Sequence, residues 1–209
     1  MQILTRAAFA AGMLVLACNA NAEPVGKASA MIPQASQQSQ GSRSDLHLRD
    51  NIIRNAELAT AERGALEVTF LDGSKLTMGQ NSRLTVDEYV YSGNASTSKQ
   101  TVRYTKGLFR YLSGSIPKDN VKIETPTVTI GIRGTIFRMA VLDDGSALTS
   151  VEYGPNGEEY EVVLTSKKTG KAIVLRSGQK VGIDGNGVFE GIVSAMQAGR
   201  SWPSISMVI

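Results

Sequence analysis

The chain has very little of the side-chain chemistry on which most enzyme sites depend. Its 209 residues include one cysteine, one histidine and one tryptophan. Without a second imidazole or thiol, cysteine nucleophiles and the common histidine or thiolate zinc sites are excluded. His47, the only histidine, lies between Leu46 and Leu48, a pattern that predicts a strand with His47 on its solvent face. We therefore expect no enzyme, no catalytic residue, no metal and no cofactor.

Carboxylates are the remaining route to catalysis, and their spacing does not favour it. Three acidic pairs are adjacent in sequence: Asp87-Glu88, Asp143-Asp144 and Glu158-Glu159. Neighbouring strand residues point to opposite faces of a sheet, so the members of a pair cannot face each other across a substrate. A glycan hydrolase built from carboxylates of different strands remains an unlikely alternative. The Asp184 to Gly187 segment (DGNG) lacks the ligand order of a calcium loop and is better explained as a hairpin turn.

The chain also lacks an apolar run long enough to span a membrane, and its longest apolar run lies near the N-terminus. Arg6 precedes the apolar run Ala7 to Ala17, and Ala20-Asn21-Ala22 forms a small-residue cleavage site, so residues 1–22 read as a secretory signal cut after Ala22. The run is about half the roughly 20 residues of a membrane-spanning helix, so we expect no transmembrane helix in the mature chain. Cys18 ends a lipobox-like Val-Leu-Ala-Cys, which gives an alternative: lipid anchoring at Cys18 as an outer-membrane lipoprotein.

Excess charge of one sign is small. Removing residues 1–22 takes away one arginine and leaves 21 basic against 19 acidic residues, a net charge of +2. The densest basic cluster, Lys167, Lys168 and Lys171, flanks Gly170 and most simply borders a hairpin turn. Nucleic-acid binding needs a basic face with aromatic or helical reading elements, and neither is found, so we expect no nucleic-acid partner.

Composition and periodicity divide the mature chain into three parts. Residues 23–44 are rich in Ala, Ser and Gln with almost no periodic apolar residues, which predicts a flexible linker. Residues 45–192 alternate apolar and polar side chains between turn signals at short intervals, which predicts one all-β domain. Its many short antiparallel strands and hairpins indicate a sandwich-like or short solenoid-like fold. Helical periodicity is weak; Leu46 to Ala61 is a candidate helix that competes with a strand. Residues 193–209 are expected to form a C-terminal tail.

The clearest hairpin is centred on an Asp-Gly pair. Leu66, Val68 and Phe70 alternate with polar residues, and Leu76 and Met78 resume the pattern after Asp72 and Gly73. Similar alternation precedes Asp143-Asp144-Gly145 and Asp184-Gly185.

The most informative segment is Thr125 to Thr135 (TPTVTIGIRGT). Val128, Ile130 and Ile132 alternate with more polar positions, and Pro126 fits the start of a strand. Gly131 and Gly134 flank Arg133, and glycine inside a strand commonly marks a bulge or a close backbone approach.

These residues carry a resemblance to a known family. The phrase from Lys122 to Phe137 resembles the signature of the FecR-like periplasmic domain family, and Asp72 to Leu84 (DGSKLTMGQNSRL) resembles that family's second motif. The motif positions are Thr125, Pro126, Gly131, Arg133, Gly134 and Thr135 in the first, and Asp72, Gly73, Asn81 and Ser82 in the second. The resemblance covers residues 46–190 and implies an exported, non-catalytic all-β module.

The expected function is therefore binding, with location in the periplasm or outside the cell. In the family that the chain resembles, the best-known members are membrane-spanning regulators whose periplasmic domain senses a transporter and whose cytoplasmic segment controls a sigma factor. In this chain we expect neither a cytoplasmic segment nor a retained transmembrane helix. The resemblance therefore implies the periplasmic module but not direct control of a sigma factor. We expect a cell-envelope protein or a surface polymer as partner, in sensing or signalling. Arg133 could bind a partner's carboxylate, although a salt bridge within the domain is favoured. A structural or adhesive protein that pairs by β-strand addition is the alternative.

Overall fold

The computed structural model describes residues 23–94 and 97–194, and these residues form an almost purely β structure. The sole helical element in the described part is a single 3-10 turn, η1 (Lys118–Asn120). The predicted all-β class is confirmed. The predicted signal, its cleavage after Ala22 and the lipid alternative at Cys18 lie outside the described residues, as does the tail beyond Ser194.

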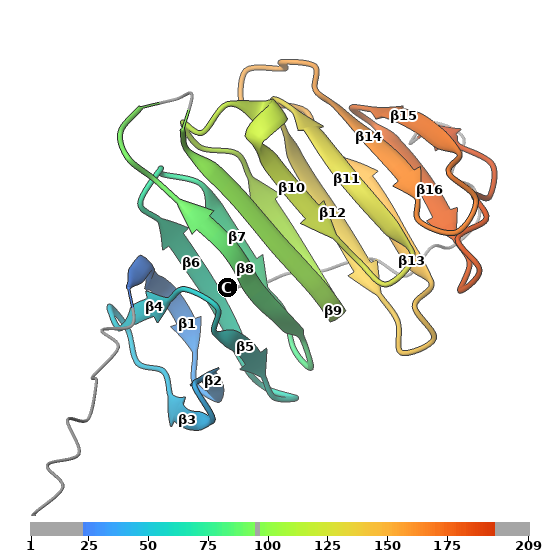
Figure 1. Cartoon of the computed structure of the whole chain (residues 1–209). Helices are drawn as coiled ribbons and strands as arrows, with labels where there is room; N and C mark the ends of the chain where they lie inside the picture. The colour runs from blue at the N-terminus through green and yellow to red at the C-terminus, as the bar shows by residue number, and fades with distance from the viewer. Residues whose placement is uncertain (1–22, 95–96, 195–209) are drawn as a thin grey trace, which may run out of the picture.

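The strands form two layers that face each other (Figure 1). The first layer, sheet A, has in spatial order the strands β4 (Asn51–Ile53), β1 (Pro24–Ile32), β6 (Ala65–Phe70), β7 (Lys75–Met78), β9 (Lys99–Leu112), β12 (Ile136–Val141), β13 (Ala147–Val151), β16 (Gln179–Ile183) and β17 (Val193–Ser194). The second, sheet B, has β3 (Ser42–Asp45), β2 (Ala35–Ser39), β5 (Glu57–Thr60), β8 (Arg83–Val90), β9, β10 (Val121–Glu124), β11 (Val128–Arg133), β14 (Glu161–Ser166) and β15 (Ala172–Arg176).

Strand β9 belongs to both sheets and joins them into one folded sheet. Its first half pairs with β8 and β10 in sheet B, and its second half pairs with β7 and β12 in sheet A. The change of sheet occurs at Gly107, whose φ of 111° is open to glycine and strained for other residues. All pairings in the described part are antiparallel except that of β9 with β10, which is parallel.

One apolar core fills the space between the layers. Every second residue of the long strands points inward, as the burial of Val128, Ile130 and Ile132 on β11 shows. The largest fully buried side chains include Tyr104, Phe109, Tyr111 and Phe137. Tyr104 and Phe109, on either side of the β9 bend, stack with ring centroids 4.1 Å apart, so the bend is anchored to the core by its flanking aromatics while residues 106–108 are half-buried.

The prediction of a flexible linker over residues 23–44 is wrong. Residues 24–32 form β1, which pairs with β4 and β6, and Val25 and Ala28 are fully buried. Small residues suit this place because the backbones approach closely: a Cβ on Gly26 would lie 2.6 Å from the carbonyl oxygen of Thr69. In β1 small residues fit the close packing against β6, whereas β2 pairs with β3 and β5 and β3 is exposed, so polar residues suit them. The domain therefore begins about twenty residues before the expected boundary.

Two smaller expectations also need correction. The segment Leu46 to Ala61 contains strands β4 and β5 and no helix. Strand β11 begins at Val128, two residues after Pro126, because the Thr125 hydroxyl accepts hydrogen bonds from the N–H groups of Thr127 and Val128 and closes a turn there.

Candidate functional site

Asp72, in the Asp-Gly-Ser motif, organises a buried polar cluster. Its Oδ1 accepts hydrogen bonds from the backbone N–H and the hydroxyl of Ser74, and its backbone N–H donates to the Tyr89 hydroxyl at 2.9 Å. Its carbonyl accepts the backbone N–H of Ser115, and its Oδ2 that of Ile116. Asp72 is 5% exposed. It therefore ties the β6–β7 turn to the loop that follows β9.

The surroundings of Asp72 also affect neighbouring ionisable groups. Burial, reinforced by the Asp72 carboxylate, raises the pKa of Tyr89 far above its usual value. Burial lowers the pKa of Lys118, and Asp72 opposes that shift. Tyr89, Phe109 and Tyr111 are buried, whereas Tyr91, just after β8, is 39% exposed.

Ser82, in the second pair of this motif, holds the bend of β9, and Asn81 precedes it in a turn. Asn81 has a positive φ of 51°. The Ser82 hydroxyl accepts the backbone N–H of Leu108 at 3.0 Å, one residue past Gly107. Ser82 thus fixes the place at which β9 passes from sheet B to sheet A, while the backbone N–H of Asn81 donates to the carbonyl of Ala61 at 3.1 Å.

The threonines and glycines of the TPTVTIGIRGT motif also have structural places. Thr135 is buried, and its hydroxyl donates to the carbonyl of Glu161 at 3.0 Å. Gly134, with φ of 66°, lies in the link from β11 to β12, which are in different sheets. Gly131 has a regular register with both neighbours, and a Cβ there would have 3.9 Å of space. The expected bulge or close approach at Gly131 is absent.

Arg133 is the one charged side chain among the motif positions that is directed to solvent; Pro126 and Asn81 are also exposed. Its Nη1 lies 3.5 Å from Glu161 Oε1, and its side chain is 64% exposed. Arg176 Nε lies 3.8 Å from Glu161 Oε2, and the Arg176 side chain is 65% exposed. One carboxylate therefore faces two guanidinium groups. We call Arg133, Glu161 and Arg176 the arginine pair site; it has one surplus positive charge and several N–H donors open to solvent.

A hollow of about 520 Å³ adjoins this site. Its lining includes Arg176 together with Tyr153, Glu159, Ser177, Gly178, Gln179 and Ser194. Tyr153 is 53% exposed. An exposed tyrosine beside an exposed arginine is typical of contact surfaces between proteins.

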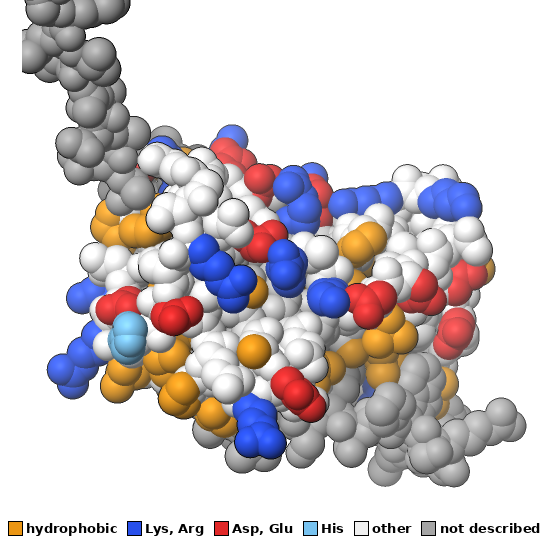
Figure 2. All heavy atoms as spheres, turned by 90° about the horizontal axis from the view of Figure 1, so that it is seen from below, with side chains coloured by type: hydrophobic (Ala, Val, Ile, Leu, Met, Phe, Trp, Pro, Cys, Tyr) orange, Lys and Arg blue, Asp and Glu red, His pale blue; other side chains and the backbone are white. Residues whose placement is uncertain are grey.

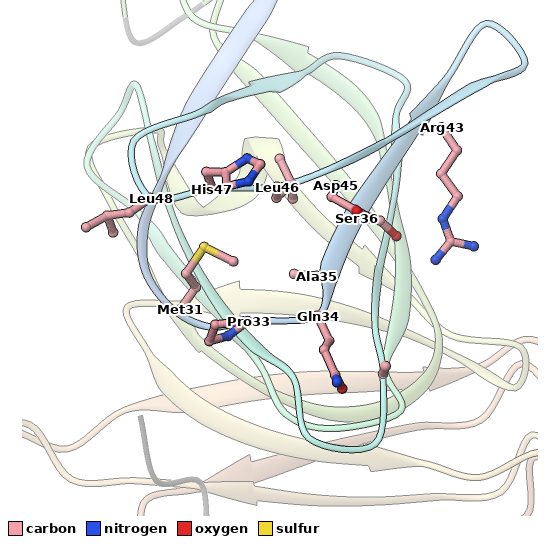
Figure 3. Close-up of a pocket in the computed structure, with 11 residues that line it drawn as sticks. Met31, Pro33, Gln34, Ala35, Ser36, Arg43, Asp45, Leu46, His47 and Leu48 are labelled. Atoms are coloured by element: carbon pink, nitrogen blue, oxygen red, sulfur yellow. The ribbon is translucent and has the colours of Figure 1, made fainter.

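A second hollow, of about 580 Å³, lies near the N-terminus of the described chain. Its mainly apolar lining is Met31, Pro33, Gln34, Ala35, Ser36, Arg43, Asp45, Leu46, His47, Leu48 and Ala61. In Figure 3 Met31 points into the space between Leu48 and Ala35, while Arg43 lies on the far side. His47 is exposed, as predicted, but it lies in the loop between β3 and β4, so the predicted strand around it is wrong. Its Nδ1 lies 3.4 Å from Asp50 Oδ2. An exposed histidine with one carboxylate lacks the third group and the buried setting of a hydrolytic site.

Most of the other carboxylates on the strands are paired with cations, whereas Asp45 and Glu88 are exposed and have no cation partner among the described residues. Glu57 pairs with Arg83, and Asp87 with Arg103. Hydrogen bonds from Lys122 and Lys167 lower the pKa of Glu124 to about 2 against the opposing effect of burial. Figure 2 shows acidic and basic side chains interspersed over the face seen from below. Within residues 23–94 and 97–194, no group of three or more His, Cys, Asp or Glu side chains could hold a metal.

The domain is thus an all-β module in which several motif residues serve the fold and Arg133 is a motif cation that faces solvent. Residues 56–155 match the model of the family described as FecR protein, so the chain contains a FecR domain. That match begins before β5 and ends between β13 and β14, so Arg133 lies inside it and Glu161 and Arg176 lie outside.

Solved structures with a similar fold come from Parabacteroides distasonis ATCC 8503. A protein named "putative anti-sigma factor", solved at 1.65 Å, has 14% sequence identity and a TM-score of 0.50, with 66% of this chain and 59% of that chain covered. A 2.50 Å structure of that name gives the same identity and coverage and a TM-score of 0.49. The chain thus spans less than two thirds of these proteins, and the likeness concerns the fold. No curated protein sequence matches the chain. In the described part of the chain, no helix is long and apolar enough to cross a membrane.

Proposed function

We propose that this protein is an exported, non-catalytic binding module of the cell envelope, which takes part in sensing or signalling through contact with another envelope protein or a surface polymer. The FecR domain and the name of the structurally similar protein support a signalling role. The predicted signal over residues 1–22 supports export. The pairing of strand carboxylates with lysine and arginine, and the exposed His47, support a role without catalysis.

The observation that carries a binding role is the arginine pair site. Glu161 balances one of the two guanidinium groups, and both side chains are about two-thirds exposed. A guanidinium binds a carboxylate through two parallel N–H donors, so a partner carboxylate can bind here while Glu161 stays in place. The adjoining hollow with Tyr153 supplies contact area beside the charge.

The test is affinity capture with residues 23–209 as bait in cell-envelope extract. We expect the wild type to retain a specific envelope component, and the double variant Arg133→Ala/Arg176→Ala to lose it. Arg83→Ala is the matched control, because Arg83 is also an exposed strand arginine of sheet B but pairs one to one with Glu57 at 2.8 Å. Capture of the same components by the double variant would remove the arginine pair site from the contact. No specific capture by the wild type would overturn the binding role.

A further inference from the structure

Strand β15 (Ala172–Arg176) forms one edge of sheet B, as seen at the right of Figure 1. Among the described strands it pairs with β14 alone, in a regular register over five residue pairs. Its other side therefore presents backbone groups that an additional strand could use.

The direction of each backbone group follows from two hydrogen bonds at the ends of the ladder. Ser166 N–H donates to the Lys171 carbonyl at 2.8 Å, and Ser177 N–H donates to the Tyr160 carbonyl at 3.0 Å. Directly bonded pairs alternate along an antiparallel ladder, so Ile173 and Leu175 direct their N–H and C=O groups to β14. The intervening Ala172, Val174 and Arg176 direct theirs away from it.

Two of these outward positions have no hydrogen-bond partner in the described part of the chain. The third, Arg176, donates its backbone N–H in a hydrogen bond to the side-chain oxygen of Gln179 at 2.8 Å. The backbone groups of Ala172 and Val174 have no recorded partner within residues 23–94 and 97–194, and the Val174 side chain is 39% exposed. Exposed edges are usually protected by proline, by charged residues or by a bulge. β15 has no proline, no charged residue before Arg176 and a regular register, so it has none of these protections before Arg176.

Both ends of this edge are positively charged. Lys171 precedes β15 and has no ion-pair partner among the described residues, while Arg176 ends the strand in the arginine pair site. A second copy of the chain paired about Val174 would place Arg176 opposite Ala172 of that copy, next to its lysine at position 171, and so bring two cations together at each end of the pairing. Charge complementarity therefore favours a partner strand with acidic ends over a second copy.

We propose that β15 accepts an extended segment of a partner protein as an additional strand of sheet B, with acidic side chains of that segment facing Lys171 and Arg176. This inference rests on the proposed function and names its surface and the chemistry of its partner. The partner segment would bond to the backbone of Ala172 and Val174 and continue past Arg176 toward the hollow lined by Tyr153.

The experiment uses a synthetic peptide as probe and ¹⁵N-labelled protein comprising residues 23–209. The probe is the acetylated and amidated hexapeptide Glu-Val-Thr-Val-Thr-Glu, whose two ends lie opposite Arg176 and Lys171 when it pairs antiparallel along residues 171–176, and the matched probe has lysine in place of both glutamates. We expect the glutamate probe to shift the amide resonances of Ala172 and Val174, with an affinity about tenfold higher than the lysine probe, a difference that should shrink at high salt.

Two substitutions of one residue separate backbone pairing from side-chain contact. Val174→Pro removes an N–H that bonds to nothing in the described structure and places a ring on the open edge, so we expect binding to fall by at least about tenfold while the fold is kept. Val174→Ala keeps the N–H and should retain binding within about threefold. Thermal unfolding of both variants checks that the fold is intact.

Three outcomes would overturn the proposal. One is an absence of shifts at Ala172 and Val174 with the glutamate probe. Another is a concentration-dependent shift at these amides without peptide, together with a doubled mass, which would make a second copy the occupant. A third is protection of these amides from hydrogen exchange in the protein comprising residues 23–209 that is lost in a chain ending at Ser194. That result would make the chain's own C-terminal segment the occupant. If the probe fails while envelope capture succeeds, the proposed function stands and its surface lies elsewhere.

Discussion

A Cβ atom on Gly107 would lie 2.2 Å from the hydroxyl oxygen of Ser82 and 2.4 Å from its Cα. Both residues are held at the point where β9 changes sheets, Ser82 by its bond to the N–H of Leu108 and Gly107 by its positive φ. The space for a side chain and the backbone conformation that would tolerate one are both missing at this position.

Gly107→Ala should therefore be among the most destabilising single substitutions in the domain. We expect a loss of about 3 kcal/mol or more in the free energy of unfolding, from backbone strain and collision with the backbone of Ser82. Gly131→Ala is the control, because it has a regular strand conformation and 3.9 Å of free space; it should change stability by no more than about 0.5 kcal/mol. Urea unfolding measures both, and equal losses would contradict the assigned role of Gly107.

The two Asp-Gly-Ser turns provide a matched test of burial. Asp72 and Asp144 each accept hydrogen bonds from the N–H and hydroxyl of the serine two residues on, and the intervening glycines have the same φ of 81°. Asp72 is buried beneath the 114–116 loop, whereas Asp144 is exposed. Asp72→Ala should cost about 2 to 4 kcal/mol, because buried donors are left without a partner. Asp144→Ala should cost about 1 kcal/mol or less. Thermal and urea unfolding would contradict this reading if the two losses were alike.

Acid should weaken the domain through Glu124. Its folded pKa of about 2 lies below its ordinary value of 4.5, so the carboxylate stabilises the folded state above pH 4.5 and that contribution is lost as the pH falls toward 2. In Glu124→Gln the decline of stability across this window should be smaller by about 1 to 2 kcal/mol, the full linkage being reduced by solvent screening. Glu152, whose pKa is lowered by hydrogen bonds from Arg110 and Arg138 despite burial, should account for part of the remaining decline.

The pH series is best read from urea midpoints at intervals of half a unit. Glu57→Gln is the control, because Glu57 makes one exposed pair with Arg83, and exposed pairs contribute little. An unchanged pH slope in Glu124→Gln would contradict the assignment.

Removal of residues 23–45 should destroy the fold rather than trim a linker. β6 would lose its neighbour β1, and the core would lose Val25 and Ala28. We expect a chain that begins at Leu46 to show no cooperative thermal transition by circular dichroism, or to aggregate through the opened edge of β6, while a chain that begins at Glu23 unfolds cooperatively. A melting temperature shared by the two chains would restore the linker interpretation.

Local patterns in the sequence predicted the elements that local patterns determine. The hairpin around Asp72 and Gly73 and the buried face of β11 follow from alternation and turn chemistry, and the structure has both. β1 escaped prediction because its partners supply the tight packing that makes small residues suitable. The parallel pairing of β9 with β10 was equally hidden, since strand order depends on contacts between distant segments.

The same limit applies to the candidate site. The family motif singled out Arg133, but its partner Glu161 lies 28 residues further along the chain. Neither Arg176 as a second cation nor β15 as a free edge could be read from the sequence, because both depend on which strands lie beside one another. A run of four residues without proline or glycine, between Lys171 and Arg176, was the one available signal for an unprotected edge.

The shared strand β9 determines how the domain can be assembled. Half of its partners, β7 and β8, precede it in the chain, and the other half, β10 and β12, follow it, so neither sheet can close until both flanks of the chain have been made. Such dependence on long-range contacts is typical of slow folding and of a single cooperative transition. The two layers should consequently form and unravel together, with no half of the domain able to persist as an independent folding unit.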